Sequence, residues 1–228
     1  MSRASFLRHA GWVSPEDLTM PLVIIGCGAV GSHVGLCAAK MGFTNFVLYD
    51  ADVVEEHNLP NQTYEPEHVG MPKVEALAAV LKRFNPEISV EINNGFFSEA
   101  NASALRGFVV IATDNMASRK LIIQLCTFNP EVDGLFEARL GFDYGEVNIV
   151  DPLSVVDCDN FTNGLKDDKD VAEGPCNLRI CTTLVGIVTS HLVHQMCAAV
   201  VAKKTNAEWQ YKRKNIFNLT PILQHVSF

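Results

Sequence analysis

The sequence has 228 residues, of which 48% are hydrophobic, and a formal net charge of -8. This length supports one substantial core and leaves little room for a second, so we expect a single domain over residues 1–228. The acidic balance argues against a general nucleic-acid or membrane-surface role, because such partners are held largely by clustered Lys and Arg.

The first 20 residues form an N-terminal segment that mixes charged and apolar side chains, which does not resemble a signal peptide. We also expect no apolar run of membrane-spanning length. The seven cysteines are an odd number, and no Cys-x-x-Cys pair occurs among them. This usage predicts reduced thiols, no zinc site and a cytoplasmic protein.

Up to residue 126, short apolar runs alternate with longer helical patterns. The runs that predict strands are 21–26, 46–49, 88–92 and 107–112, and the patterns that predict helices are 29–41, 73–84 and 116–126. Such alternation predicts a parallel sheet with helices on both faces. The fold class is therefore α/β, Rossmann-like and doubly wound.

The rhythm changes after residue 130. Residues 132–139 and 145–150 predict a hairpin, and residues 152–178 are polar and acidic, which predicts a long crossover loop. A long apolar helix is expected over 179–202, and residues 216–217 and 222–228 predict an edge strand. The mostly parallel sheet should thus carry a small antiparallel extension.

A glycine motif follows the first predicted strand. Gly26-Cys-Gly28-Ala-Val-Gly31 fits G-x-G-x-x-G at the start of a helix, where backbone N–H groups and the helix dipole favour a phosphate. Asp50 ends the next strand, where a carboxylate can accept hydrogen bonds from ribose hydroxyls. The two features predict a nucleotide site, and they leave ATP, NAD and FAD open.

The segment after Asp50 resembles the ThiF/MoeB family, the relatives of ubiquitin-activating enzymes. The family pattern D-x-D-x-V-x-x-x-N-L-x-R-Q, followed by G-x-x-K, corresponds to residues 50–62 and 70–73 here, with one substitution. Thr113-Asp114-Asn115 with Arg119 downstream also resembles the family's T-D-N motif, and Arg8 precedes the first strand. The resemblance covers about residues 3–150 well and the remainder loosely.

This resemblance implies ATP and Mg²⁺ as cofactors. Lys73 corresponds to the family lysine that contacts the triphosphate, and Asp114 to the Mg²⁺ ligand. The implied nucleotide-binding residues are Gly26, Gly28, Ala29, Val30, Gly31, Asp50, Asp52, Asn58, Asn61, Gln62, Lys73, Thr113, Asp114 and Asn115.

One position departs from the family pattern. Asn61 stands where the family has Arg, so one positive charge near the phosphates is missing or comes from elsewhere. The resemblance implies that an arginine of a partner subunit's N-terminal segment can serve, and Arg8 is a better fit than Arg3. Both arginines also have a plain interpretation as solvated terminal charges.

Two further groups have open interpretations. Cys176 and Cys181 lie where ubiquitin-activating relatives carry a thioester cysteine, so each is a candidate nucleophile or an incidental thiol. Glu137, Arg139 and Asp143 surround the predicted hairpin, and they either pair as ions or grip an extended peptide.

The sequence thus predicts ATP- and Mg²⁺-dependent adenylylation of a carboxylate, with the C-terminus of a ubiquitin-like or sulfur-carrier protein of the Gly-Gly type as partner. The resemblance also implies a homodimer. Two alternatives remain: a small-molecule or tRNA-borne carboxylate as the substrate, as in threonylcarbamoyladenosine dehydratases, and an NAD oxidoreductase or inactive nucleotide-binding scaffold.

Overall fold

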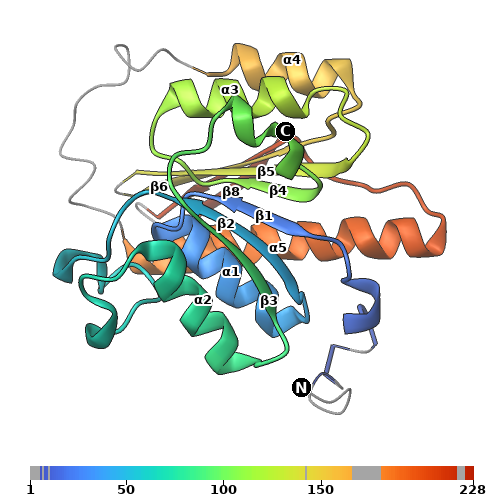
Figure 1. The fold of residues 1–228 in the computed structure, drawn as a ribbon. Coiled ribbons are helices and arrows are strands. Elements are labelled where there is room, and N and C mark those ends of the chain that lie inside the picture. Colours follow the sequence, from blue (N-terminus) through green and yellow to red (C-terminus); the bar gives the residue numbers. More distant parts are fainter. Residues whose placement is uncertain (1–5, 7, 10, 142, 166–180, 220–223) are drawn as a thin grey trace.

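The computed structural model describes residues 6, 8–9, 11–141, 143–165, 181–219 and 224–228. Eight strands form one sheet in the order β3-β2-β1-β4-β5-β6-β7-β8 (Figure 1). The strands are β1 Leu22–Ile25, β2 Asn45–Asp50, β3 Ser89–Asn94, β4 Gly107–Ile111, β5 Val132–Leu140, β6 Tyr144–Val150, β7 Lys214–Asn218 and β8 Gln224–Ser227. The helices are α1 Ala29–Met41, α2 Lys73–Phe84, α3 Met116–Cys126, α4 Val155–Asn163 and α5 Thr182–Thr205.

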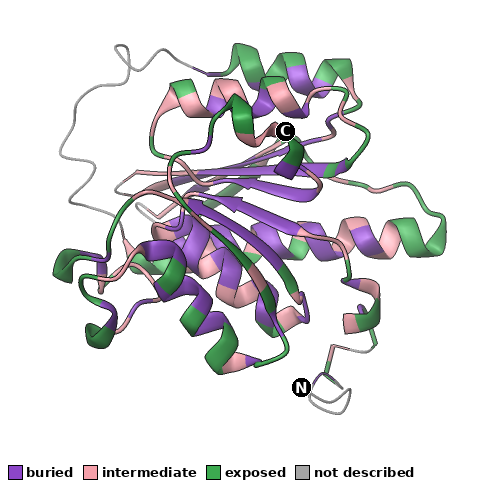
Figure 2. Ribbon diagram, viewed as in Figure 1, coloured by how far each residue is buried: buried purple, intermediate pink, exposed green. Residues whose placement is uncertain are grey.

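The predicted fold class is confirmed. Strands β3, β2, β1, β4 and β5 are parallel, whereas β6, β7 and β8 add on in antiparallel pairs. Helices α1, α2 and α5 cover one face, and α3 and α4 cover the other (Figure 1). The central strands β1 and β4 are buried along their whole length, which is why they read as continuous apolar runs (Figure 2).

The three helices predicted before residue 130 match α1, α2 and α3 residue for residue. Gly42 ends α1 with a φ of 118°, a left-handed conformation that glycine adopts at little cost. The predicted hairpin is the β5–β6 pair, in which Arg139 lies opposite Glu146. The two terminal runs form β7 and β8, so the antiparallel extension is confirmed.

The predicted loop over residues 152–178 is wrong in its first part. Residues Val155–Asn163 form α4, and the side chain of Ser154 caps this helix by accepting from the N–H of Asp157. Cys158, Phe161 and Leu165 recur at helical spacing and are buried. Polar residues, including Asp159, separate them and concealed this period. Residues 166–180 lie outside the described part of the chain.

The long helix α5 also corrects an expectation. Its 24 residues are long and apolar enough to cross a membrane by length and composition, contrary to the sequence analysis. Half of its most apolar window is buried inside the protein, and α5 packs against α1, β5 and β6. The same composition suits a helix whose inner side covers a sheet, and α5 covers the sheet in this way.

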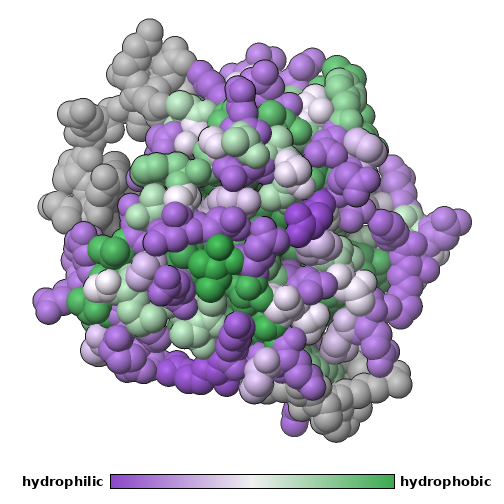
Figure 3. Space-filling model, viewed as in Figure 1, coloured by the Kyte–Doolittle hydropathy of each residue, from purple (hydrophilic) through white to green (hydrophobic). Residues whose placement is uncertain are grey.

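The edge strand β3 contrasts with this core. None of its six residues is buried, and Ile92 is 42% exposed. Phe96, just beyond the strand, is 83% exposed. The face seen in Figure 3 is mostly hydrophilic, with a hydrophobic patch near its middle, over β3.

Candidate functional site

The turn between β1 and α1 requires glycine at two positions. Gly26 has a φ of 99°, and a Cβ there would lie 2.4 Å from the carbonyl oxygen of Ala112. A Cβ on Gly31 would lie 1.8 Å from the carbonyl oxygen of Gly26. Gly28 differs, because nothing lies within 4 Å of its Cβ position. The outer two glycines therefore close the turn, and the middle one leaves open space.

The open side of the turn offers backbone donors. Helix α1 begins at Ala29, and its N-cap residue, Gly28, has no side chain to pair with the first N–H groups. Among the described residues, no acceptor pairs with the N–H of Gly28 or of Ala29. Val30 is buried, and its side chain packs in the core. Unpaired N–H groups at a helix start fit a phosphate.

Asp50 braces this turn from the end of β2. Its Oδ2 accepts from the N–H of Cys27 at 2.6 Å, and its Oδ1 accepts from the N–H of Asp52 at 2.8 Å. Burial raises the pKa of Asp50, and the two N–H donors act in the opposite direction. Each carboxylate oxygen can accept a further hydrogen bond, so the predicted contact with ribose is compatible with this bracing.

Lys73 lies at the start of α2, beside the segment that follows β2. Its backbone N–H donates to the carbonyl of Asp52 at 2.9 Å, and its Nζ lies 2.7 Å from Asp52 Oδ2. The Lys73 side chain is 10% exposed and that of Asp52 is 63% exposed. A bridge between Val53 and Pro72 fixes the two segments together. The chain thus holds a shielded cation next to the glycine turn.

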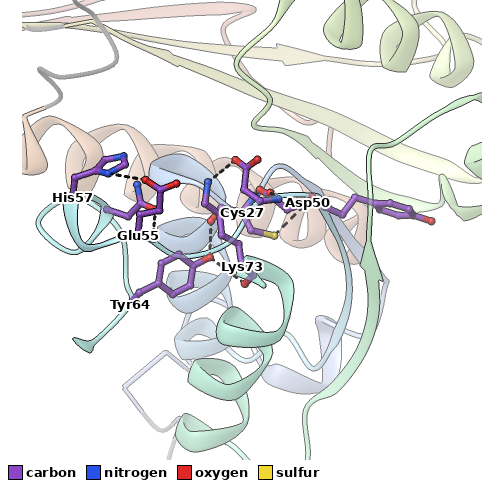
Figure 4. A network of polar contacts seen from close by, with 9 residues as sticks. Cys27, Asp50, Glu55, His57, Tyr64 and Lys73 are labelled. Atoms are coloured by element: carbon purple, nitrogen blue, oxygen red, sulfur yellow. Dashed lines mark hydrogen bonds and ion pairs between the residues drawn. The ribbon is translucent and has the colours of Figure 1, made fainter. Parts of the chain in front are cut away.

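Tyr64 connects the glycine turn to the start of α2 (Figure 4). The sequence did not predict this role. Its buried hydroxyl donates to the carbonyl of Cys27 at 2.6 Å and lies 3.2 Å from the carbonyl oxygen of Lys73. Burial is the main reason that the pKa of Tyr64 is raised, so the hydroxyl keeps its proton. A tyrosine among polar loop residues carries no sequence signal of such a contact.

The loop of residues 58–62, which we name the phosphate-pocket loop, holds three more of the predicted nucleotide-binding residues. Asn58 is buried, and its Oδ1 accepts from the N–H of Glu55 at 3.0 Å, so this side chain closes the loop itself. Asn61 Oδ1 and Gln62 Oε1 are buried, and neither has a hydrogen-bond partner among the described residues. Polar atoms buried in this way fit a ligand that donates hydrogen bonds to them.

The end of β4 meets the turn from the other side. The backbone of Ala112 and Thr113 is what a Cβ on Gly26 would strike, so the two segments are in contact. Asp114 is exposed. Asn115 is a helix cap, because its side chain accepts from the N–H of Ser118 at 2.7 Å. This bond fixes the Asn115 side chain at the start of α3, and the second lone pair of its oxygen can still accept from a nucleotide.

Arg119 of α3 holds the end of β4 through a contact with Thr113. It is buried, donates to the carbonyl of Thr113 and forms an ion pair with Glu137 of β5. In the part of the chain that the structure describes, no three His, Cys, Asp or Glu side chains gather to hold a metal ion. A Mg²⁺ ion bound at Asp114 would therefore take most of its ligands from phosphate oxygens and water.

Comparisons with known proteins agree with this geometry. The sequence pattern of the ThiF family matches residues 18–225. The chain belongs to the ThiF family. SAMP-activating enzyme E1 of Haloferax volcanii is 33% identical over 124 residues, which are 51% of this chain and 46% of that protein. This chain therefore spans about half the length of that relative.

Solved structures share the fold of this ThiF family member. That of E. coli MccB with ATP has a TM-score of 0.73 at 16% identity, over 94% of this chain and 65% of that one. That of E. coli tRNA N6-threonylcarbamoyladenosine dehydratase has a TM-score of 0.71 at 21% identity, over 90% of this chain and 97% of that one.

The N-terminal segment lies away from the turn of this ThiF family fold. Trp12 stacks on His194 of α5 with ring centroids 4.7 Å apart, and Pro15 packs at Gly42, the end of α1 opposite the turn. Arg8 is exposed on this segment. No contact between described residues brings Arg8 to the glycine turn of its own chain.

The described cysteines of this ThiF family chain are free thiols with contrasting environments. Burial is the main cause that raises the pKa of Cys27, which makes that thiol a poor nucleophile. Cys181 caps α5, and a contact of 2.9 Å with Thr183 Oγ1 is the main cause that lowers its pKa. Thr182 Oγ1 donates to the carbonyl of Pro60 at 2.6 Å, which places Cys181 beside the phosphate-pocket loop. Cys176 lies outside the described residues.

The charged residues of the hairpin form a buried network. Glu137 Oε1 accepts from Arg139 Nε at 2.7 Å, and Glu137 Oε2 accepts from Asn148 Nδ2 at 2.6 Å. Glu137 also pairs with Arg119, as described above. These contacts support the ion-pair interpretation of Glu137 and Arg139.

Proposed function

We propose that this chain binds ATP with Mg²⁺ and adenylylates a carboxylate, with the C-terminus of a ubiquitin-like or sulfur-carrier protein as the preferred substrate. The observation that carries the proposal is the meeting of an N–H-lined glycine turn, a shielded lysine and an exposed carboxylate at one edge of the sheet. Membership of the ThiF family supports it, as does the solved structure of E. coli MccB with ATP.

In the proposed reaction, an oxygen of the substrate carboxylate attacks the α-phosphorus of ATP. A new P–O bond forms, the bond between the α-phosphorus and the bridging oxygen to the β-phosphate breaks, and pyrophosphate leaves with that oxygen. No side chain needs to exchange a proton. The chain's part is to position the triphosphate and to offset the charge on the departing pyrophosphate.

Each part of the site has a task in this scheme. The N–H groups at the start of α1 would receive a phosphate, and Asp50 would hold the ribose. Lys73 would turn from Asp52 towards the phosphates as a compact cation. Asp114 would hold Mg²⁺, which would neutralise charge on the triphosphate.

The proposal also covers the transfer of the acyl group after adenylylation, the oligomeric state and the cellular compartment. Cys181 is the candidate nucleophile among the described residues, and it stands beside the phosphate-pocket loop with a lowered pKa, which suits it to accept the acyl group. We also propose a homodimer in which Arg8 of one subunit replaces the charge that Asn61 lacks in the other. The free thiols of the described cysteines suit a reducing cytoplasm.

ATP–pyrophosphate exchange tests the proposal. Purified protein is incubated with ATP, labelled pyrophosphate and a panel of carrier proteins that end in Gly-Gly, each compared with the same carrier lacking its last two residues. We expect exchange that depends on Mg²⁺ and on an intact carrier tail. Exchange with threonylcarbamoyl-tRNA instead would favour the dehydratase-like alternative. Binding of NAD in preference to ATP would contradict the proposal.

A further inference from the structure

Tyr64 is a buried side chain that contacts both the glycine turn and the first residue of α2. It lies in the loop between β2 and α2 with 5% of its surface exposed. Its hydroxyl donates to the Cys27 carbonyl at 2.6 Å, and the Lys73 carbonyl oxygen lies 3.2 Å away. The proposed reaction assigns it no task. A hydroxyl has a single proton to donate, so the shorter contact, to Cys27, is the principal hydrogen bond.

This contact fixes the direction of one peptide unit. The carbonyl of Cys27 and the N–H of Gly28 belong to the same planar trans peptide, in which the two bonds point in opposite directions. A hydroxyl that holds the carbonyl towards the buried side therefore turns the Gly28 N–H away from that side. That N–H has no acceptor among the described residues.

The neighbouring peptide is fixed separately. Asp50 accepts from the N–H of Cys27, which belongs to the Gly26–Cys27 peptide. Without the Tyr64 hydroxyl, the Cys27–Gly28 peptide would keep no such restraint on its carbonyl, and glycine permits the rotated conformation at little cost. The rotated unit would present a carbonyl oxygen, and thus partial negative charge, where a phosphate is to bind.

We propose that Tyr64 is a positioning residue, whose hydroxyl aims the Gly28 N–H at a phosphate of the bound nucleotide and ties that donor to the helix start that carries Lys73. This inference rests on the nucleotide site of the proposed function. It concerns phosphate groups alone, because adenosine has none to receive the N–H. The prediction is therefore a loss of affinity that depends on the ligand.

The test is the Tyr64→Phe variant, with binding of adenosine, ADP and ATP measured by isothermal titration calorimetry. We expect roughly a tenfold loss of affinity for ADP and ATP, the size of one hydrogen bond to a charged group, and an unchanged affinity for adenosine. Tyr211→Phe is a matched control, because that hydroxyl donates to Asp157 of α4, on the opposite face of the sheet. It should leave all three affinities unchanged.

Two results would overturn the inference while the proposed function stands. They are an ATP affinity of Tyr64→Phe equal to that of the wild type, and an equal loss for adenosine and ATP, which would mark a purely structural role. If the variant does not fold, the test is the chemical shift of the Gly28 amide in the wild-type protein, measured by NMR as each ligand is added. It should shift with ADP and ATP and stay in place with adenosine, and no shift with ATP overturns the inference. Wild-type binding of NAD over ATP would overturn the proposed function and this inference together.

Discussion

The two sides of the candidate site are built differently. On the side of the glycine turn, the side chains of Asp50 and Tyr64 hold the backbone at Cys27, and Lys73 pairs with Asp52. On the side of β4, Asp114 is exposed, and its support comes from Arg119 behind it. Substitutions on the first side should therefore tend to change both stability and ligand binding. Substitutions on the second side should change ligand binding alone.

The largest effect should come from Gly31→Ala. Its Cβ would stand 1.8 Å from the carbonyl oxygen of Gly26, a backbone atom of a residue that packs closely against Ala112. We expect the free energy of unfolding, measured by urea denaturation, to fall by at least about 3 kcal/mol. Gly28→Ala is the control: with open space around its Cβ, it should change stability by less than about 1 kcal/mol and still weaken ATP binding. A Gly31→Ala protein of wild-type stability would contradict the described turn.

Lys73→Ala should come next. Removing the shielded cation should slow ATP–pyrophosphate exchange about 100-fold or more, because the charge of the departing pyrophosphate loses its compensation. Lys40→Ala, an exposed lysine at the far end of α1, is the matched control and should exchange at the wild-type rate. An oxidoreductase would be indifferent to Lys73→Ala, so an unchanged rate or nucleotide affinity would exclude the role given to this lysine.

The sequence predicted the first of these two sides well, because its signals are local. Apolar runs marked β1 and β2, and the glycine spacing marked the turn, since steric limits at Gly26 and Gly31 admit few alternatives. The family pattern then placed Lys73 next to that turn, and the contact between Lys73 and Asp52 agrees with this placement.

Other features depended on contacts between distant segments, which a single sequence does not reveal. Tyr64 contacts Cys27 across 37 positions of the chain, and nothing in its neighbourhood announces the bond. Asn115 matched a nucleotide motif, yet its side chain serves the start of α3. Helix α4 was concealed because its two buried apolar residues, Cys158 and Phe161, stand among polar and acidic side chains.

Asp114→Asn probes the second side. Because the side chain is exposed and the amide keeps its shape, thermal stability should stay within about 0.5 kcal/mol of the wild type. The amide is a weaker ligand for a hard cation, so the gain in ATP affinity on adding Mg²⁺ should shrink about tenfold. Asp159→Asn, an exposed carboxylate on α4, should leave the Mg²⁺ dependence unchanged. A full Mg²⁺ effect in Asp114→Asn would show that the metal ligand lies elsewhere.

The smallest expected effect concerns Cys181, the candidate thiol for accepting the acyl group. Thr183 is the main cause of the lowered pKa of Cys181, so Thr183→Val should raise that pKa and move the midpoint of the alkylation rate to higher pH. At neutral pH a smaller fraction of the thiol is then ionised, and labelling of Cys181 by iodoacetamide should slow a few-fold. Mass spectrometry of tryptic peptides follows it separately from Cys176, because Arg179 lies between them. Cys126, whose pKa burial raises to about 12, is the internal control and should label only on unfolding. Equal rates in the variant and the wild type would mean that the Thr183 hydroxyl does not activate this thiol.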